Sequence, residues 1–167
     1  MREVLRHSNM KGSENIMAAK ENNKKETYDC LRLDNQLCFP MYVCSKEIVR
    51  RYKPFLDEID LTYTQYITMM AMWEKKKVNV KELGELLFLD SGTLTPLLKK
   101  MEDKGLLTRT RSKQDERNLI VEITKKGEDL KEKAKDIPEK LGSCLAMPPE
   151  DAVKLYEILH RFMGTMN

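Results

Sequence analysis

Apolar residues recur every three or four positions along the first patterned segment of the chain, between residues 34 and 59. This spacing predicts a helix whose apolar face is formed by Leu37, Met41, Cys44, Ile48 and Tyr52. Asp34 is the expected N-cap, because a short acidic side chain accepts hydrogen bonds from the first backbone N–H groups of a helix. Pro40 removes a backbone donor early in this segment, so either the first turn bends or the regular helix begins later.

The next apolar positions predict three helices in close succession. A near-continuous apolar run, LTYTQYITMMAMWEKK, predicts a deeply buried helix with Thr62 as its cap. A short helix follows from Val80. The segment LDSGTLTPLLKKMEDKG then predicts a helix that is capped by Asp90 or Ser91 and stopped by Gly105. Its inward stripe consists of Leu94, Leu97, Leu98 and Met101.

Beyond Gly105 the period of the pattern changes from helical to alternating. LLTRTRSKQDERNLIVEIT alternates apolar and polar residues on both sides of a polar centre, which predicts a β-hairpin with a charged tip. The alternating positions are Leu107, Arg109 and Arg111 on the way in and Leu119, Val121 and Ile123 on the way out. Two helices close the chain, one over residues 125–145 that is broken or bent at Pro138, and one over residues 149–163.

The predicted order of elements is helix, helix, short helix, helix, hairpin, helix, helix. A short helix, a tight turn, a second helix and a hairpin together form the winged helix-turn-helix arrangement. The predicted fold class is therefore mainly α with a small β-wing (α+β), with six helices. In such a fold the second helix of the pair enters the major groove of DNA while its leucines pack inward.

Composition is compatible with this helical fold and limits the kind of partner. The 167 residues suffice for one compact domain, and 34% of them are charged. Because the formal net charge is only +3, contact with nucleic acid must come from a local basic patch rather than from bulk charge. Residues 1–30 are polar and weakly patterned, which predicts a flexible extension.

No apolar run reaches the roughly 18–20 residues that a membrane span needs, and the N-terminus lacks the apolar core of a signal peptide. A cytoplasmic location without membrane contact is therefore expected, and structural disulfides are rare in that compartment. The cysteines form no CxxC pair and the histidines lie far apart in sequence, so neither a metal site nor another cofactor is expected. These residues are Cys30, Cys38, Cys44 and Cys144, with His7 and His160.

Hydroxyls and lysines on the predicted recognition helix can reach base edges and phosphates. They are Ser91, Thr93, Thr95, Lys99 and Lys100. The hairpin tip is basic and suited to the adjacent minor groove, through Arg109, Arg111, Lys113 and Arg117. Asp115 lies two residues before Arg117 and is placed to orient its guanidinium group. Each feature alone also fits a solvated helix or an ordinary charged hairpin, and it is their order along the chain that favours DNA binding.

Longer motifs carry a family resemblance. VKELGELLFLDSGTLTPLLKKMEDKGLLTRTRSKQDERNLIVEIT resembles the DNA-binding core of the MarR family, and DERNLIVEIT within it resembles the wing motif. LDNQLCF, YKPFLDEIDLTYTQY and LDSGTLTPLLKKME are similar to the organic-hydroperoxide-sensing branch, the OhrR type. The resemblance runs from about Leu33 to the C-terminus.

The resemblance implies a homodimeric repressor and not an enzyme. Residues 31–60 and 125–167 would form the dimer interface, and residues 61–124 the winged helix-turn-helix domain. The recognition helix would span residues 91–104, and Arg117 of each wing would enter a minor groove. Two such helices imply a palindromic operator in double-stranded DNA with half-sites about one turn apart.

Cys38 has two possible roles in this setting. A cysteine among leucine, phenylalanine and methionine is usually a small buried hydrophobe. Against that, Cys38 lies near a helix start, where the helix dipole favours the thiolate that attacks a peroxide to give sulfenic acid. Tyr42 follows at i+4, on the same face, and its hydroxyl can donate to the sulfur.

In the hydroperoxide-sensing branch, the cysteine of the LxNQLCF context is the sensor and tyrosines bond to it, which here implies Tyr42, Tyr52 and Tyr63. Cys38 and Tyr52 are 14 residues apart, or about 21 Å along a straight helix, so a Tyr52 that serves Cys38 must come from the partner subunit. Each tyrosine also fits an interface or core aromatic. Pro40 departs from the branch, in which an aliphatic or small residue is usual.

The remaining cysteines differ in their expected roles. Cys144 resembles the second cysteine of two-cysteine members, which forms an intersubunit disulfide with the oxidised sensor. One-cysteine members use a small external thiol instead, and Cys144 would then be incidental. Cys44 is expected to be structural and Cys30 an exposed bystander.

The sequence therefore predicts a peroxide-responsive repressor whose operator is released after an organic hydroperoxide or a related oxidant oxidises Cys38. One competing hypothesis is a MarR-type repressor released by non-covalent binding of a small aromatic ligand. A thiol peroxidase is a second alternative, but nothing in the sequence resembles an arginine-assisted peroxidatic loop or a thioredoxin-like fold.

Overall fold

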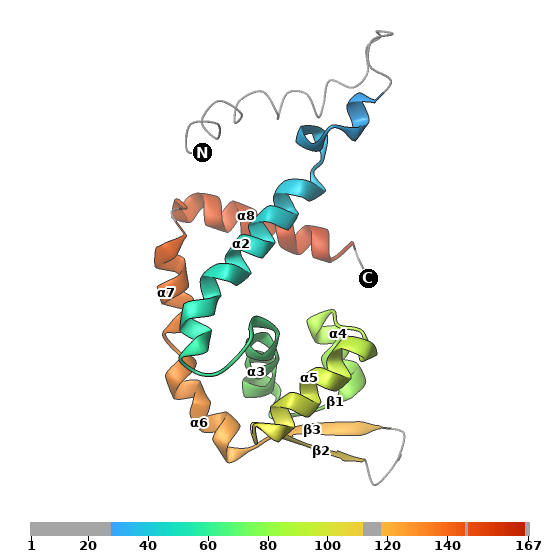
Figure 1. Cartoon of the computed structure of the whole chain (residues 1–167), viewed down its shortest axis with the longest axis vertical. Helices are drawn as coiled ribbons and strands as arrows, with labels where there is room; N and C mark the ends of the chain where they lie inside the picture. Colours follow the sequence, from blue (N-terminus) through green and yellow to red (C-terminus); the bar gives the residue numbers. More distant parts are fainter. Residues whose placement is uncertain (1–27, 112–117, 146, 166–167) are drawn as a thin grey trace. The chain divides into compact units, whose positions relative to one another are not determined.

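In the computed structural model the described residues are 28–111, 118–145 and 147–165, and they fall into two units (Figure 1). The first unit ends at Arg50 and the second begins at Arg51, so each is described by itself. The flexible extension predicted for residues 1–30 falls mainly on residues 1–27, which lie outside the described part of the chain.

The first unit consists of two short 3₁₀ turns and the beginning of a long helix. η1 (Asp29–Leu31) and η2 (Leu33–Asn35) precede α2 (Cys38–Asp57), which continues into the second unit. The N-cap predicted at Asp34 is wrong, because Asp34 lies inside η2 and the α-helix begins only at Cys38. The later start that Pro40 allowed is confirmed, since Pro40 is the third residue of α2, where a missing N–H removes no helical hydrogen bond.

Helix α3 (Tyr63–Lys75) lies at the centre of the core of the second unit. Thr62 caps it as predicted, since its hydroxyl accepts the Gln65 N–H at 3.3 Å and the Gln65 side chain accepts the Thr62 N–H at 3.0 Å. The deep burial predicted for this helix is confirmed. Its buried apolar residues are Tyr66, Met69, Ala71, Met72 and Trp73.

Helices α4 (Val80–Leu87) and α5 (Ser91–Asp103) form the helix-turn-helix pair. Asn79 caps α4 and Asp90 caps α5, each through a side-chain oxygen that accepts a backbone N–H. Gly105 follows α5 with a φ of +70°, the conformation that made glycine the predicted stop. The predicted inward stripe is confirmed, with Leu97 partly buried and three residues fully buried, Leu94, Leu98 and Met101.

The predicted hairpin is formed by β2 (Leu107–Arg111) and β3 (Leu119–Ile123), which pair with Leu107 opposite Ile123. A third strand, β1 (Lys77–Asn79), pairs antiparallel with β3, and the sheet order is β1-β3-β2. The sequence did not predict β1, because three residues are too few to show an alternating pattern. In Figure 1 the hairpin of β2 and β3 lies below the helices α3, α4 and α5 of the second unit.

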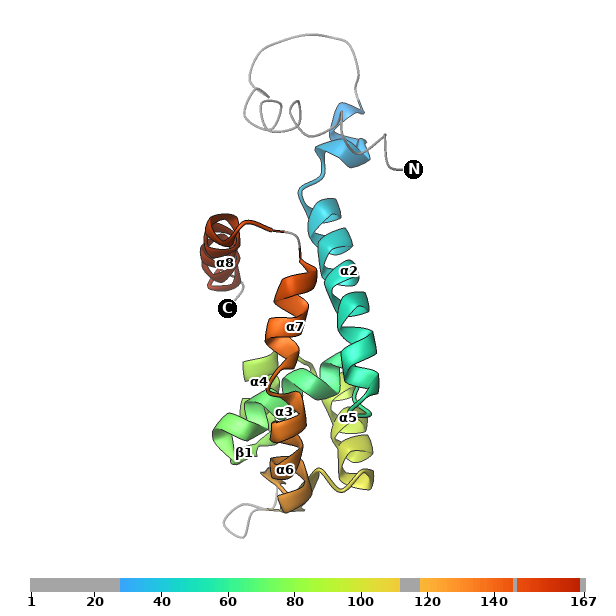
Figure 2. The same ribbon diagram turned by 90° about the vertical axis from the view of Figure 1, so that its left-hand side faces the viewer.

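Three helices follow the wing, namely α6 (Lys125–Ala134), α7 (Ile137–Cys144) and α8 (Pro149–Met163). The break predicted near Pro138 is confirmed, because Pro138 occupies the first turn of α7, and Figure 2 shows α6 and α7 in succession. The six predicted helices are therefore present, the fifth of them as α6 and α7. Across residues 28–111, 118–145 and 147–165, no helix has both the length and the apolar character needed to cross a lipid bilayer.

Candidate functional site

The outward face of α5 presents the predicted hydroxyls and lysines to solvent, while its leucines point into the core. The first turn is fixed by Asp90, whose carboxylate accepts the Thr93 N–H at 2.9 Å and the Thr93 hydroxyl at 3.0 Å. These hydrogen bonds, the backbone one first, lower the pKa of Asp90 below its usual 3.8. The exposed residues of this face are Ser91, Thr93, Thr95, Lys99 and Lys100.

The two arginines that the structure describes in strand β2 have different surroundings. Arg111 is exposed at the end of the strand. The guanidinium group of Arg109 donates to the carboxylate of Glu102, from Nε at 2.9 Å and from Nη2 at 2.6 Å. The predicted tip residues Lys113, Asp115 and Arg117 lie outside the described residues.

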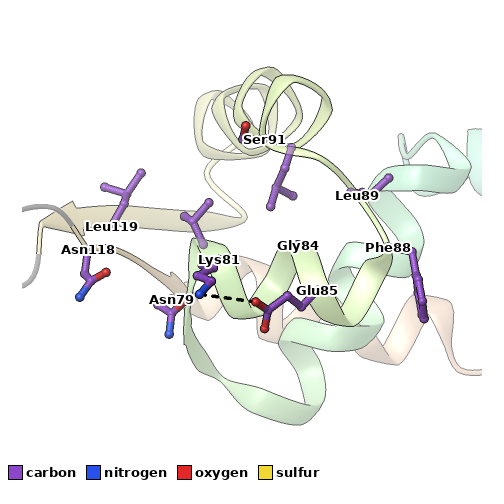
Figure 3. A pocket seen from close by; sticks show the side chains of 11 residues that line it. Asn79, Lys81, Gly84, Glu85, Phe88, Leu89, Ser91, Asn118 and Leu119 are labelled. Carbon is purple, nitrogen blue, oxygen red and sulfur yellow. Dashed lines mark ion pairs between the residues drawn. The ribbon is translucent and has the colours of Figure 1, made fainter. Parts of the chain in front are cut away.

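A groove of about 590 Å³ lies beside the N-terminus of α5, between α4, α5 and the start of β3 (Figure 3). Lys81 and Glu85 form an ion pair of 3.8 Å on its wall, and Ser91 also lines it. None of the predicted sensor residues lines this groove. The groove is therefore formed by the helix-turn-helix pair and the sheet, without the cysteines or the predicted tyrosines.

Cys38 is the first residue of α2 and its thiol is free and exposed. Tyr42 follows one turn later and is also exposed, with the Lys46 amine 6.0 Å from its ring centre. The turn before Cys38 is held by side-chain amides, since Asn35 donates to the Asp29 carbonyl at 2.9 Å and Gln36 donates to the Cys30 carbonyl at 2.5 Å. These bonds hold the backbone before α2, where a side-chain cap from Asp34 was predicted.

The structure brings two of the predicted tyrosines together in the second unit. The ring centres of Tyr52 and Tyr63 are 5.0 Å apart, and Tyr66 lies 5.7 Å from Tyr52. Burial, followed by the neighbouring tyrosines, raises the pKa of Tyr52 above its usual 10.0. Tyr52 therefore remains a hydrogen-bond donor at neutral pH. Sequence reasoning missed Tyr66, whose burial in α3 joins this cluster to the core.

Cys144 is the last residue of α7, and its thiol is free and exposed. Its backbone carbonyl accepts a hydrogen bond from the Arg51 guanidinium group, which ties the end of α7 to α2 within the second unit. Cys38 belongs to the first unit and Cys144 to the second. Cys30 and Cys44 are likewise free and exposed.

Comparison with known proteins identifies the family. A family model described as the transcriptional regulator SarA/Rot matches residues 50–134. This chain belongs to the SarA/Rot family of transcriptional regulators. This regulator is also 44% identical to the organic hydroperoxide resistance transcriptional regulator of Bacillus subtilis over 140 residues, which cover 84% of this chain and 95% of that protein. The resemblance to the hydroperoxide-sensing branch is thereby confirmed.

Further similarities extend over most of the regulator. It is 50% identical to the HTH-type transcriptional regulator SarZ of Staphylococcus saprophyticus over 132 residues, which cover 79% of this chain and 90% of that protein. Reduced AbfR bound to DNA matches with a TM-score of 0.68 at 31% identity, covering 82% of this chain and 95% of that one. A disulfide-formed AbfR matches with a TM-score of 0.57 at 33% identity, covering 81% and 92%; AbfR is a protein of Staphylococcus epidermidis. These similarities confirm the predicted winged-helix fold and DNA-binding class.

Proposed function

We propose that this regulator is a repressor that binds its operator as a homodimer and releases it when an organic hydroperoxide oxidises Cys38. The 44% identity with the organic hydroperoxide resistance regulator carries the proposal. A match over 140 of 167 residues leaves out at most 27 residues, so it includes both the segment around Cys38 and the wing. The DNA-bound and disulfide-formed AbfR structures support a link between thiol oxidation and DNA binding in a relative.

In the proposed complex α5 lies in the major groove. Ser91, Thr93 and Thr95 face base edges and neighbouring phosphates near the start of the helix, and Lys99 and Lys100 contact phosphates further along. Exposure of these side chains and burial of the opposite stripe support this orientation.

The wing extends the proposed contact into the minor groove. Exposed Arg111 approaches the phosphates, and Arg117, oriented by Asp115, enters the groove itself.

Homodimerisation is supported by α8, a helix without a single buried residue. Its apolar side chains are left in water within one subunit, which a soluble helix avoids unless a partner covers them. They are Val153, Leu155, Tyr156, Ile158, Leu159, Phe162 and Met163. The proposed dimer buries this face together with the exposed apolar residues of α2, and its symmetry requires a palindromic operator.

The proposed chemistry begins at the Cys38 sulfur. The thiolate attacks the terminal oxygen of the hydroperoxide ROOH, so that an S–O bond forms and the O–O bond breaks. The alkoxide RO⁻ leaves and takes a proton from water to become the alcohol ROH. The resulting sulfenic acid condenses with the thiol of the partner's Cys144, forming an S–S bond and releasing water. A small external thiol can take the place of Cys144 in the same condensation.

The tyrosines position the peroxide and link its reduction to the operator. Tyr42 lies one turn from Cys38. In the proposed dimer Tyr52, with Tyr63 beside it, donates to the sulfur of Cys38 of the partner subunit. A disulfide removes the tyrosine hydrogen bonds to the sulfur. The winged units then rotate, and two recognition helices no longer match the spacing of the half-sites.

The test is a gel-shift titration with cumene hydroperoxide on a duplex selected in vitro with the reduced protein. Cys38→Ser is expected to bind this duplex and to keep it at peroxide doses that release the wild type. Cys44→Ser is the matched control, because it removes an exposed thiol from the same helix, and it is expected to respond like the wild type. Release of Cys38→Ser at the wild-type dose refutes the sensor assignment. Release of the reduced wild type by a small aromatic ligand favours the non-covalent alternative instead.

A further inference from the structure

The C-terminal end of the recognition helix is bonded to the base of the wing through one carboxylate. Glu102, in the last turn of α5, accepts the backbone N–H of Arg109 at 3.0 Å with Oε1. Its Oε2 accepts Nε of the same arginine at 2.9 Å and Nη2 at 2.6 Å. Main chain and side chain of one wing residue are therefore held by a single side chain of the helix.

This pair is better shielded from solvent than the ion pair between Lys77 and Glu122 in the sheet. The side chains of Arg109 and Glu102 are 19% and 34% exposed, whereas those of Lys77 and Glu122, an ion pair joining β1 and β3, are 60% and 50% exposed. Charge-assisted bonds of a planar guanidinium group restrict orientation as well as distance. The Arg109 hydrogen bonds also lower the pKa of the Glu102 carboxyl below its usual 4.5, so the carboxylate is charged at neutral pH.

Two further bonds stiffen the same junction. The Thr124 hydroxyl donates to the Gly105 carbonyl at 2.7 Å, and the Thr124 N–H donates to the Leu106 carbonyl at 3.1 Å. They join the turn after α5 to the end of β3. The Glu102 hydrogen bonds connect β2 to α5 in the same way, so both strands of the wing are bonded near the C-terminal end of α5.

The net charge of the pair bears on DNA binding. A guanidinium group that shares its charge with a carboxylate forms a neutral pair, which attracts the phosphate backbone weakly and displaces few counterions. Arg111, two residues further along the same strand, has no ion-pair partner among the described residues and keeps its full charge. The two arginines of β2 are therefore not equivalent.

We propose that Glu102 is a positioning residue for operator binding, which uses Arg109 to set the angle between the recognition helix and the wing. This inference rests on the proposed DNA-binding function. It changes the role of Arg109 from the predicted minor-groove contact to a connection between the recognition helix and the wing. A wing whose base is released from α5 loses its fixed alignment with the minor groove, and operator affinity falls although no DNA contact has been deleted.

The experiment measures operator affinity against salt concentration for the reduced full-length protein. The slope of log K, where K is the operator association constant, against log salt concentration is negative. Arg111→Ala is expected to make it less steep by about 0.9, the effect of one lost phosphate contact. Arg109→Ala and Glu102→Ala are both expected to weaken binding about three- to tenfold with the slope unchanged. If Arg109 is instead a phosphate contact, Glu102→Ala frees its charge and binding tightens with a steeper slope, which overturns the proposal.

Exchanging the two charges distinguishes the proposed positioning role of the Glu102–Arg109 pair from a general loss of stability. Glu102→Arg combined with Arg109→Glu restores an ion pair while placing a negative charge on the wing, and it is expected to bind at least threefold more tightly than Arg109→Glu alone. Failure of this rescue overturns the proposal. Amide hydrogen exchange is measured in parallel on the protein without DNA. The Arg109 N–H is expected to lose protection in Glu102→Ala, because its acceptor is removed. Absence of operator binding by the wild type would refute the proposed function. The exchange result would still test whether Glu102 holds the base of the wing.

Discussion

Gly127, in the first turn of α6, is the described glycine at which an added methyl group would meet its neighbours most closely. A Cβ added there would overlap the carbonyl oxygen of Leu106 and stand 2.9 Å from Cγ1 of Ile123. The first of these neighbours is backbone and cannot move by changing rotamer. The same glycine accepts the indole N–H of Trp73 at 2.9 Å through its carbonyl, so a shift of α6 also strains the bond to α3.

The expected cost follows from two opposing effects. Overpacking a tight contact costs about 1–3 kcal/mol, and a clash with backbone lies at the upper end of that range. Replacing glycine by alanine in a helix returns up to about 1 kcal/mol. Gly127→Ala is therefore expected to lose about 2 kcal/mol of unfolding free energy, which lowers Tm by about 4–8 °C in a chain of this size.

The assay is a thermal melt followed by circular dichroism and by fluorescence. Trp73 is the single tryptophan of the chain, so its emission reports on the strained junction. Gly142→Ala in α7 is the matched control, because nothing lies within 4 Å of the added Cβ, and it is expected to raise Tm slightly. The packing argument fails if Gly127→Ala melts at or above the wild-type temperature while Gly142→Ala behaves as expected.

Two further predictions concern oxidation and pH. After treatment with organic hydroperoxide, non-reducing electrophoresis is expected to show a band at twice the subunit mass that is absent in Cys144→Ser; a dimer band that persists in this variant contradicts the two-cysteine mechanism. The folded state lowers the pKa values of Glu102 and Asp90 below their usual 4.5 and 3.8, so it binds fewer protons than the unfolded chain. The two carboxylates therefore stabilise the fold at pH values above these usual pKa values. This contribution is lost as the pH falls through and below them. Urea unfolding midpoints measured between about pH 6 and about pH 3 are expected to fall less in the Glu102→Gln and Asp90→Asn double variant than in the wild type.

Most of the fold could be predicted because its signals are local. Thr62, Asp90 and Gly105 mark the ends of helices through their own hydrogen bonds and backbone angles, so one sequence suffices to read them. Asp34 shows the limit of this reasoning. It has the chemistry of a cap, but the backbone there forms a 3₁₀ turn, and the next helix begins only at Cys38.

Contacts between elements were less accessible to sequence reasoning. The bonds from Glu102 to Arg109 cross from a helix through a turn into a strand, and a periodicity predicts neighbours only within one element. The sequence therefore identified Arg109 as a basic wing residue but gave no sign of its partner. Strand β1 was missed for a similar reason, because its identity depends on pairing with β3 about 40 residues away.

Helix α2 is the covalent link between the proposed sensor and the second unit, which contains the helix-turn-helix pair. It begins at Cys38 and reaches the buried Leu56 in the core of the second unit. Pro54 has no N–H to donate to the carbonyl of Arg50, so the helical hydrogen-bond ladder is interrupted where the first unit ends. A distortion introduced at Cys38 is therefore expected to be taken up as a bend at this interruption, before it reaches the packed core. In the proposed dimer, such a bend would change the angle between the two winged units. The proposed palindromic operator is sensitive to that angle, because two recognition helices must fit it at once.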